Sequence, residues 1–113
     1  MRPYKHPTPD QLTLERIFHA LSDPIRLEIV QHLARVEMAT CGELDGGRPK
    51  SSMSHHFRIL RDAGLVHTQA EGTNHQNRLR LDELNARFPG LMDAVLAQTE
   101  ASSGRVGKPR RKR

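Results

Sequence analysis

The stretch from Lys50 to Ala63 constrains the fold more than any other part of the chain. Pro49 stands just before it, and the fixed φ of proline suits the first turn of a helix. Gly64 follows it and tolerates the left-handed conformation that ends many helices. Apolar residues within the stretch repeat at i, i+4 and i+7, which predicts one buried stripe along a helix. These residues are Met53, Phe57 and Leu60.

Another side of this predicted helix is polar and carries short hydroxyls, an imidazole and a guanidinium. Such groups hydrogen-bond to base edges or phosphates, and they are small enough for the helix to enter a major groove. A plain solvated face is the alternative, and the neighbouring segments decide between the two. The polar side chains belong to Ser51, Ser52, Ser54, His55, Arg58 and Asp62.

The length of 113 residues predicts one domain, and a hydrophobic content of 35% without Trp predicts a small aliphatic core. A domain of this kind often completes its core by dimerising. No apolar run approaches the roughly 18 residues that span a bilayer, and the first residues lack the apolar segment of a signal peptide. The single Cys forms no internal disulfide. We therefore expect a cytoplasmic protein.

The positive charge of the chain is unevenly distributed. The net charge is +5, although residues 1–47 and 81–100 are each net negative. Residues 48–80 hold six Lys or Arg against two acids, which is the electrostatic footprint of a nucleic-acid surface. Residues 101–113 hold six Lys or Arg and no acid, which predicts a disordered basic tail. This tail either grips DNA phosphates or serves only solubility.

Two helices are predicted ahead of this region, after a flexible arm at residues 1–9 that is rich in proline. The first begins near Asp10 or Thr13, either of which can cap it. Asp23 and Pro24 end it and begin the second, which runs to about residue 35. Arg26 and Glu28 are expected to face outward on this second helix. The apolar positions are Leu14, Ile17, Phe18 and Leu21 in the first helix, and Leu27, Ile29, Val30 and Leu33 in the second.

A short helix at residues 40–44, capped by Thr40, and a glycine-rich turn precede the helix at 50–63. A short helix, a turn and a longer helix with a polar outer face form a helix-turn-helix. Residues 65–71 then have strand character, Gly72 and Thr73 suit a two-residue hairpin turn, and a second strand returns to Leu81. This hairpin predicts a wing, with Arg78 and Arg80 pointing outward.

The last region is predicted as a turn at residues 82–87, capped by Asp82, and a helix from about Pro89 to Glu100. Its apolar stripe is wide for so small a core, so we expect a two-fold dimer in which it meets the first helix. The alternative is that it packs only within its own chain. The predicted interface residues are Leu14, Ile17, Phe18, Leu91, Met92, Val95 and Leu96. The expected fold is mainly α with a small β-hairpin, in the order α-α-α-α-β-β-α, over residues 10–100.

Two stretches now resemble a known family, the ArsR-type winged helix-turn-helix transcriptional repressors of bacteria. The first is the passage between helices at residues 20–29, ALSDPIRLEI. The second is SSMSHHFRILRDAGLV at residues 51–66, which is similar to the family's recognition helix and its entry into the wing. The resemblance covers about residues 13–98. It implies a homodimer that binds a partly palindromic operator and blocks transcription until a signal releases it.

The resemblance also implies which residues contact DNA. His56 matches a position that faces the packing side, so we interpret it as structural. The base-reading positions would be Lys50, Ser51, Ser52, Ser54 and His55, with Arg58 and Arg61 nearer the backbone. The wing contacts would come from Thr73, Asn74, His75 and Arg78.

The region that holds paired metal-binding cysteines in many family members contains one Cys here, Cys41. A soft thiolate site needs two or three such ligands, and no His follows His75 in the chain. We therefore expect no metal and no cofactor. Cys41 in the first turn of a helix is a possible redox site, because backbone N–H groups there favour the thiolate. An inert, half-buried or buried small residue is the alternative.

Two other functions remain alternatives to a DNA-binding repressor. A winged-helix module that binds proteins instead of DNA would carry acidic or apolar groups where this sequence has Ser, His and Arg. An enzyme would need paired carboxylates, a phosphate-binding glycine loop or a nucleophile with its base, and none is apparent. We therefore predict a regulator with double-stranded DNA as its partner and no enzymatic activity.

Overall fold

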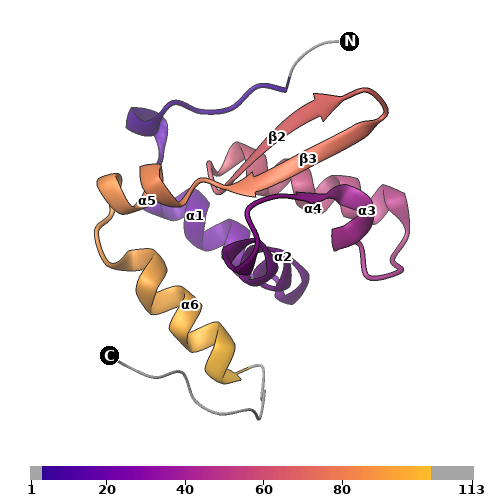
Figure 1. Ribbon diagram of the computed structural model, residues 1–113. Coiled ribbons are helices and arrows are strands. Elements are labelled where there is room, and N and C mark those ends of the chain that lie inside the picture. Colours follow the sequence, from indigo (N-terminus) through magenta and orange to yellow (C-terminus); the bar gives the residue numbers. More distant parts are fainter. Residues whose placement is uncertain (1–3, 103–113) are drawn as a thin grey trace.

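A computed structural model describes residues 4–102, with side chains through Ala97. Figure 1 shows helices packed against one side of a small antiparallel sheet whose hairpin extends away from the body. The basic tail lies outside the described residues from 103 onward, so its predicted role is untested. The elements are η1 (Pro9–Gln11), α1 (Leu14–Leu21), α2 (Pro24–Arg35), β1 (Ala39–Thr40), α3 (Cys41–Leu44), α4 (Lys50–Asp62), β2 (Val66–Glu71), β3 (Asn74–Leu79), α5 (Leu81–Arg87) and α6 (Leu91–Ser102).

The helix starts follow the predicted capping residues. Thr13 caps α1, since its side chain accepts the N–H of Arg16. Asp23 caps α2 by accepting the N–H groups of Ile25 and Arg26 at 2.8 and 3.2 Å, and Pro24 occupies the first helical position. Thr40 and Glu43 form a reciprocal capping box at the start of α3. These three predictions are confirmed.

The helix α4 covers the predicted stretch, with two differences in detail. Pro49 is the N-cap, with extended backbone, and so lies one position before the first helical turn. Ala63 is the C-cap, and Gly64 follows it with φ +84°, the left-handed conformation expected of this glycine. The predicted stripe faces inward, because Met53, Phe57 and Leu60 are all buried.

The hairpin forms as predicted, but it belongs to a sheet of three strands. Gly72 has φ +62° in the turn, and Val66 pairs with Leu79 at the far end. The short strand β1 pairs with β3, giving the order β1-β3-β2 and leaving β2 at an edge. The sequence analysis missed β1, because two residues carry no recognisable periodicity.

The predicted second strand is two residues too long. It ends at Leu79, and Arg80 is buried at 4% exposure instead of pointing outward as predicted. Its Nε lies 3.3 Å from Oε1 of Glu83, three residues further on. The segment predicted as a turn capped by Asp82 is the helix α5, which begins at Leu81 with Arg80 as its N-cap. Both expectations were wrong, because Arg80 turns inward at the end of the hairpin and pairs with α5.

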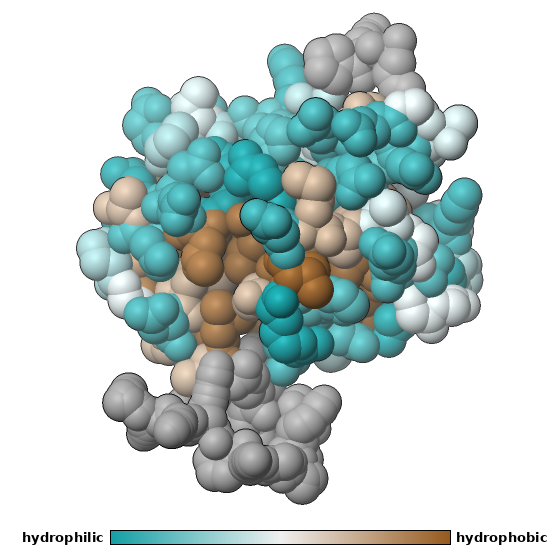
Figure 2. All heavy atoms as spheres, in the orientation of Figure 1, coloured by the Kyte–Doolittle hydropathy of each residue, from teal (hydrophilic) through white to brown (hydrophobic). Residues whose placement is uncertain are grey.

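The helix α6 follows Gly90, whose φ of +87° makes the turn after α5. It packs on α2 and α5. Two residues of the predicted dimer surface, Ile17 and Met92, are fully buried in the chain's own core at 0% exposure. They therefore offer no surface to a partner. Figure 2 shows apolar side chains gathered where α1, α2 and α6 come together.

Candidate DNA-binding surface

The helix α4 separates its packing residues cleanly from its polar ones. His56 is 9% exposed and lies among the buried residues of the helix, as its structural interpretation predicts. The side chains predicted to read bases or contact the backbone lie on the exposed side, where Arg61 is partly exposed. The fully exposed ones are Lys50, Ser51, Ser52, Ser54, His55 and Arg58.

The buried cation Arg26 holds α4 in place from behind. It is 6% exposed and so does not face outward as the sequence analysis predicted. Its Nε donates to the carbonyl oxygen of Ala20 at 2.8 Å, and its Nη1 lies 3.1 Å from Nδ1 of His56. Arginine is usually a surface residue, and only the three-dimensional structure shows the acceptors that satisfy it here. The polar face of α4 therefore rests on a hydrogen-bonded base.

The wing presents its predicted residues to different extents. Thr73 and Asn74 are exposed at the tip of the hairpin, whereas His75 and Arg78 are partly exposed. They extend the same polar surface beyond α4, because β2 packs against that helix. The structure thus places the predicted wing residues together on one hairpin.

A buried polar residue that the sequence analysis missed, Asn77, fixes the base of the wing. Its Oδ1 accepts the hydroxyl of Thr68 at 2.7 Å, joining β3 to β2. Its Nδ2 lies 3.3 Å from both the carbonyl oxygen of Ala39 and Sγ of Cys41. Asparagine is common in turns, so its sequence position near the hairpin tip gave no sign of burial. These contacts connect the wing to the start of α3.

Cys41 is therefore a half-buried residue whose sulfur accepts a hydrogen bond from Asn77. It lies in the first turn of α3, as predicted. Its possible redox role stays a prediction.

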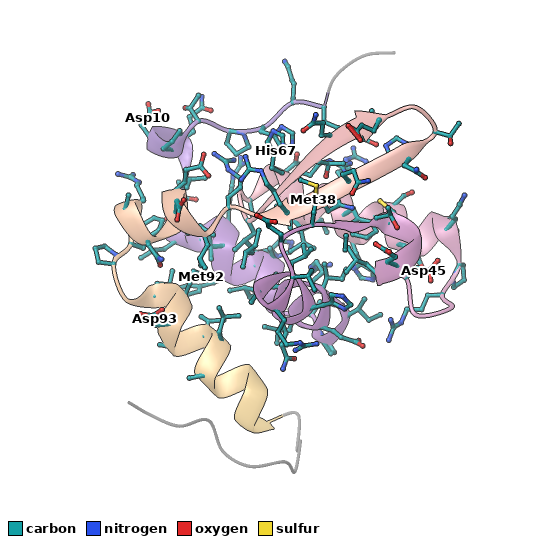
Figure 3. All side chains as sticks on the ribbon, viewed as in Figure 1. Asp10, Met38, Asp45, His67, Met92 and Asp93 are labelled. Atoms are coloured by element: carbon teal, nitrogen blue, oxygen red, sulfur yellow. The ribbon has the colours of Figure 1, made fainter. Side chains whose placement is uncertain are left out.

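The N-terminal segment lies across the wing, although a flexible arm was expected there. The hydroxyl of Tyr4 is 2.8 Å from Nδ1 of His75, and Nε2 of His6 accepts the N–H of Thr68 at 3.0 Å. The rings of His6 and His67 stack with their centroids 4.2 Å apart, and Figure 3 shows His67 beside this segment. Residues 4–6 thus adjoin the candidate surface.

The surface is electropositive, because its cations are not neutralised. In the part of the chain that the structure describes, the ion pairs join Arg48 to Glu28 and Arg80 to Glu83. Arg61 and Arg78 form none there. Burial lowers the pKa of His6 to about 4, with His67, Arg80, Arg61 and Arg78 contributing by charge repulsion. His6 is therefore neutral at neutral pH, as its acceptor role requires.

Other kinds of site were sought among residues 4–97. No group of three or more His, Cys, Asp or Glu side chains lies close enough there to hold a metal ion. Within the described chain, none of the helices combines the length and apolar character needed to cross a bilayer.

The short helix α3, the turn, the exposed face of α4 and the adjoining hairpin define a winged helix-turn-helix domain, a class that binds DNA. A family model described as a helix-turn-helix domain matches residues 21–69. The chain is 34% identical over 89 residues to an uncharacterised HTH-type transcriptional regulator, YceK of Bacillus subtilis, covering 76% of this chain and 88% of YceK. It is 37% identical over 76 residues to the arsenical resistance operon repressor of Staphylococcus xylosus, covering 64% of this chain and 73% of that repressor.

Solved structures agree with these sequence relatives. An ArsR-like transcriptional regulator from Rhodococcus sp. RHA1 superposes with a TM-score of 0.56 at 27% identity, covering 86% of this chain and 94% of the other. The chain belongs to the ArsR-type winged helix-turn-helix family of transcriptional repressors. The fold and family expected from the sequence are thereby confirmed.

Proposed function

We propose that this DNA-binding regulator acts as a homodimeric repressor that places α4 in the major groove of a partly palindromic operator. The observation that carries the proposal is the division of α4 into a buried face and an exposed face of hydroxyls, imidazole and guanidinium. Ser54 and His55 are exposed near the middle of the helix, where their side chains can reach base edges. Arg58 and Arg61 lie toward its C-terminal end and supply charge for phosphates.

The wing provides the second contact. Thr73 and Asn74 at its tip can reach the backbone or minor groove beside the α4 site, and Arg78 adds a phosphate contact. Asn77 supports this role, because a hairpin fixed at its base holds its tip in a defined position at lower entropic cost. Phosphate contacts set the register, and the residues of α4 supply sequence preference.

The dimer is proposed from exposed apolar side chains on α1. Leu14 and Phe18, one helical turn apart, are 41% and 53% exposed, which is unusual for large hydrophobic residues in so small a domain. Leu91 and Val95 on α6 are partly buried against the core and add to the same predicted interface. Joining two copies here would present two α4 helices to DNA, and two-fold dimers of this class read half-sites roughly 34 Å apart.

The proposal is tested by selecting bound duplexes from a random-sequence pool with the full-length protein and footprinting the enriched DNA. The expected result is an enriched site with two inverted half-sites about one helical turn apart, protected on one face. Enrichment of no sequence, with binding that depends only on salt, would contradict sequence-specific operator recognition. The same selection with Ser54→Ala serves as the matched control, because it removes one hydroxyl from the reading face.

A further inference from the structure

The N-terminal segment connects two parts of the proposed DNA-binding surface through a single side chain. Cζ of Arg61, at the end of α4, lies 4.3 Å from the centroid of the Tyr4 ring. The hydroxyl of the same tyrosine is 2.8 Å from Nδ1 of His75 on β3, and the two rings meet edge to face at 5.6 Å. Tyr4 thus contacts the recognition helix and the wing at once.

His6 fixes the segment that carries this tyrosine. Its Nε2 accepts the N–H of Thr68 on the outer edge of β2, a backbone donor that has no neighbouring strand on that side. Its ring stacks on that of His67. These contacts anchor the chain two residues from Tyr4, so the position of Tyr4 does not depend on its own contacts alone.

Both partners of Tyr4 keep donors for another ligand. A guanidinium that stacks on an aromatic face still directs its N–H groups outward in its own plane. When the phenol donates to Nδ1 of a neutral imidazole, the proton of that imidazole lies on Nε2, which then acts as a donor. Phosphate oxygens are acceptors, so both groups are suited to a DNA backbone.

We propose that Tyr4 is a positioning residue for DNA binding, which holds the Arg61 guanidinium and the Nε2–H tautomer of His75 in place to contact backbone phosphates. The inference rests on the proposed function and adds to it a residue outside α4 and the wing. In this role Tyr4 touches no DNA, and it acts by fixing the distance and orientation between the recognition helix and the wing.

The test compares Tyr4→Leu, which removes both contacts, with Tyr4→Phe, which keeps the ring beneath Arg61 and removes only the hydroxyl. The probe is the duplex that the wild-type protein enriches from a random pool. We expect Tyr4→Leu to weaken binding about tenfold and to lower the salt slope by one to two lost phosphate contacts, about 0.9 per contact. Tyr4→Phe should lose only the part that depends on His75.

A double-mutant cycle separates positioning from general stability. In a His75→Ala background, Tyr4→Phe should have no further effect on binding, because the hydroxyl acts through that imidazole. Nitrogen-15 spectra of the DNA-free protein at mildly alkaline pH should show His75 protonated at Nε2, and this signature should be lost in Tyr4→Phe. Thermal unfolding and sedimentation of each variant serve as controls for folding and assembly.

Three outcomes would overturn the inference. Wild-type affinity and salt slope in Tyr4→Leu would show that the tyrosine positions nothing, and His75 protonated at Nδ1 would remove the donor on which the role depends. If the wild-type protein enriches no duplex, the proposed function fails and the inference fails with it. The spectra of His75 distinguish the two cases, because they report the Tyr4 contact without DNA.

Discussion

Nη1 of Arg26 lies 3.1 Å from Nδ1 of His56, a contact that joins α2 to the buried side of α4. The guanidinium is 6% exposed and the imidazole 9% exposed. Because the arginine donates, Nδ1 of His56 must be unprotonated. Burial lowers the pKa of His56 and the charge of Arg26 lowers it further, whereas Asp23 acts in the opposite direction. The recognition helix is therefore attached to the body through a neutral histidine and a buried cation.

The Arg26→Met substitution should destabilise the fold. It removes the donors that satisfy the carbonyl oxygens of Ala20 and His19 and Nδ1 of His56, while retaining an apolar chain of similar length. We expect a loss of about 2–4 kcal/mol in the free energy of unfolding, measured by urea titration. Arg35→Met, at an exposed position of the same helix, is the control and should change stability by less than about 0.5 kcal/mol. Equal effects of the two substitutions would refute a structural role for Arg26.

Gly64→Ala should be more harmful than Gly72→Ala, although both glycines have positive φ, +84° and +62°. A Cβ at position 64 would overlap the side chain of Leu12, whereas nothing lies within 4 Å of one at position 72. We expect Gly72→Ala to cost about 1 kcal/mol from the backbone alone, and Gly64→Ala to cost about 2–4 kcal/mol in thermal or urea unfolding. Similar costs at both sites would show that Leu12 moves aside freely.

Docking of the N-terminal segment should weaken in acid. The pKa of His6 in the folded chain, about 4, lies below its ordinary value of 6.5, chiefly through burial and then through the charges of His67, Arg80, Arg61 and Arg78. The released segment therefore binds a proton more readily than the docked one, and docking is full above about pH 6.5 and is lost progressively as the pH falls toward 4.

Tyr4 reports this release directly, because the chain has one Tyr and no Trp. Its emission should change between pH 6.5 and 4 while the far-ultraviolet circular dichroism stays constant. The change should shrink in His6→Gln, whose amide oxygen can accept the Thr68 N–H without titrating; any remainder would reflect His67, whose pKa burial also lowers. An emission profile that is the same in His6→Gln and the wild type would exclude His6 as its cause.

Phe18→Asp should yield monomers in sedimentation velocity experiments. The side chain is 53% exposed on α1, so the charge is tolerated in the single chain, but burying a carboxylate in an apolar interface without a partner is costly. Met38→Asp provides the control, because Met38 is 46% exposed on the segment between α2 and β1 and lies outside the proposed interface. If Phe18→Asp dimerises as the wild type does, the interface lies on another face.

Local rules allowed much of this structure to be predicted from sequence. Thr13, Asp23 and Thr40 cap helices wherever the chain lies in space, and Gly72 makes its turn through its own conformation. The apolar stripe of α4 was equally readable, because a helix repeats its faces at a fixed period.

The misses share a different cause. Arg26, Asn77 and Arg80 are polar residues whose burial depends on partners distant in sequence or on a turn of the chain, and composition gives no sign of those partners. The docking of Tyr4 was hidden for the same reason, since His75 lies 71 residues away. The predicted DNA contacts fall on exposed positions of α4 and the wing, but the residues that hold those elements together emerged only from the structure.

The affinity of Ser54→Ala and His55→Ala for the duplex selected by the wild-type protein tests the central claim most directly. The comparison uses a duplex with scrambled half-sites as the control, at one fixed salt concentration. The account predicts that each substitution costs about 1–3 kcal/mol on the selected duplex, leaves binding to the scrambled duplex unchanged and does not alter the fold. Wild-type affinity of both variants for the selected duplex would contradict base reading by α4.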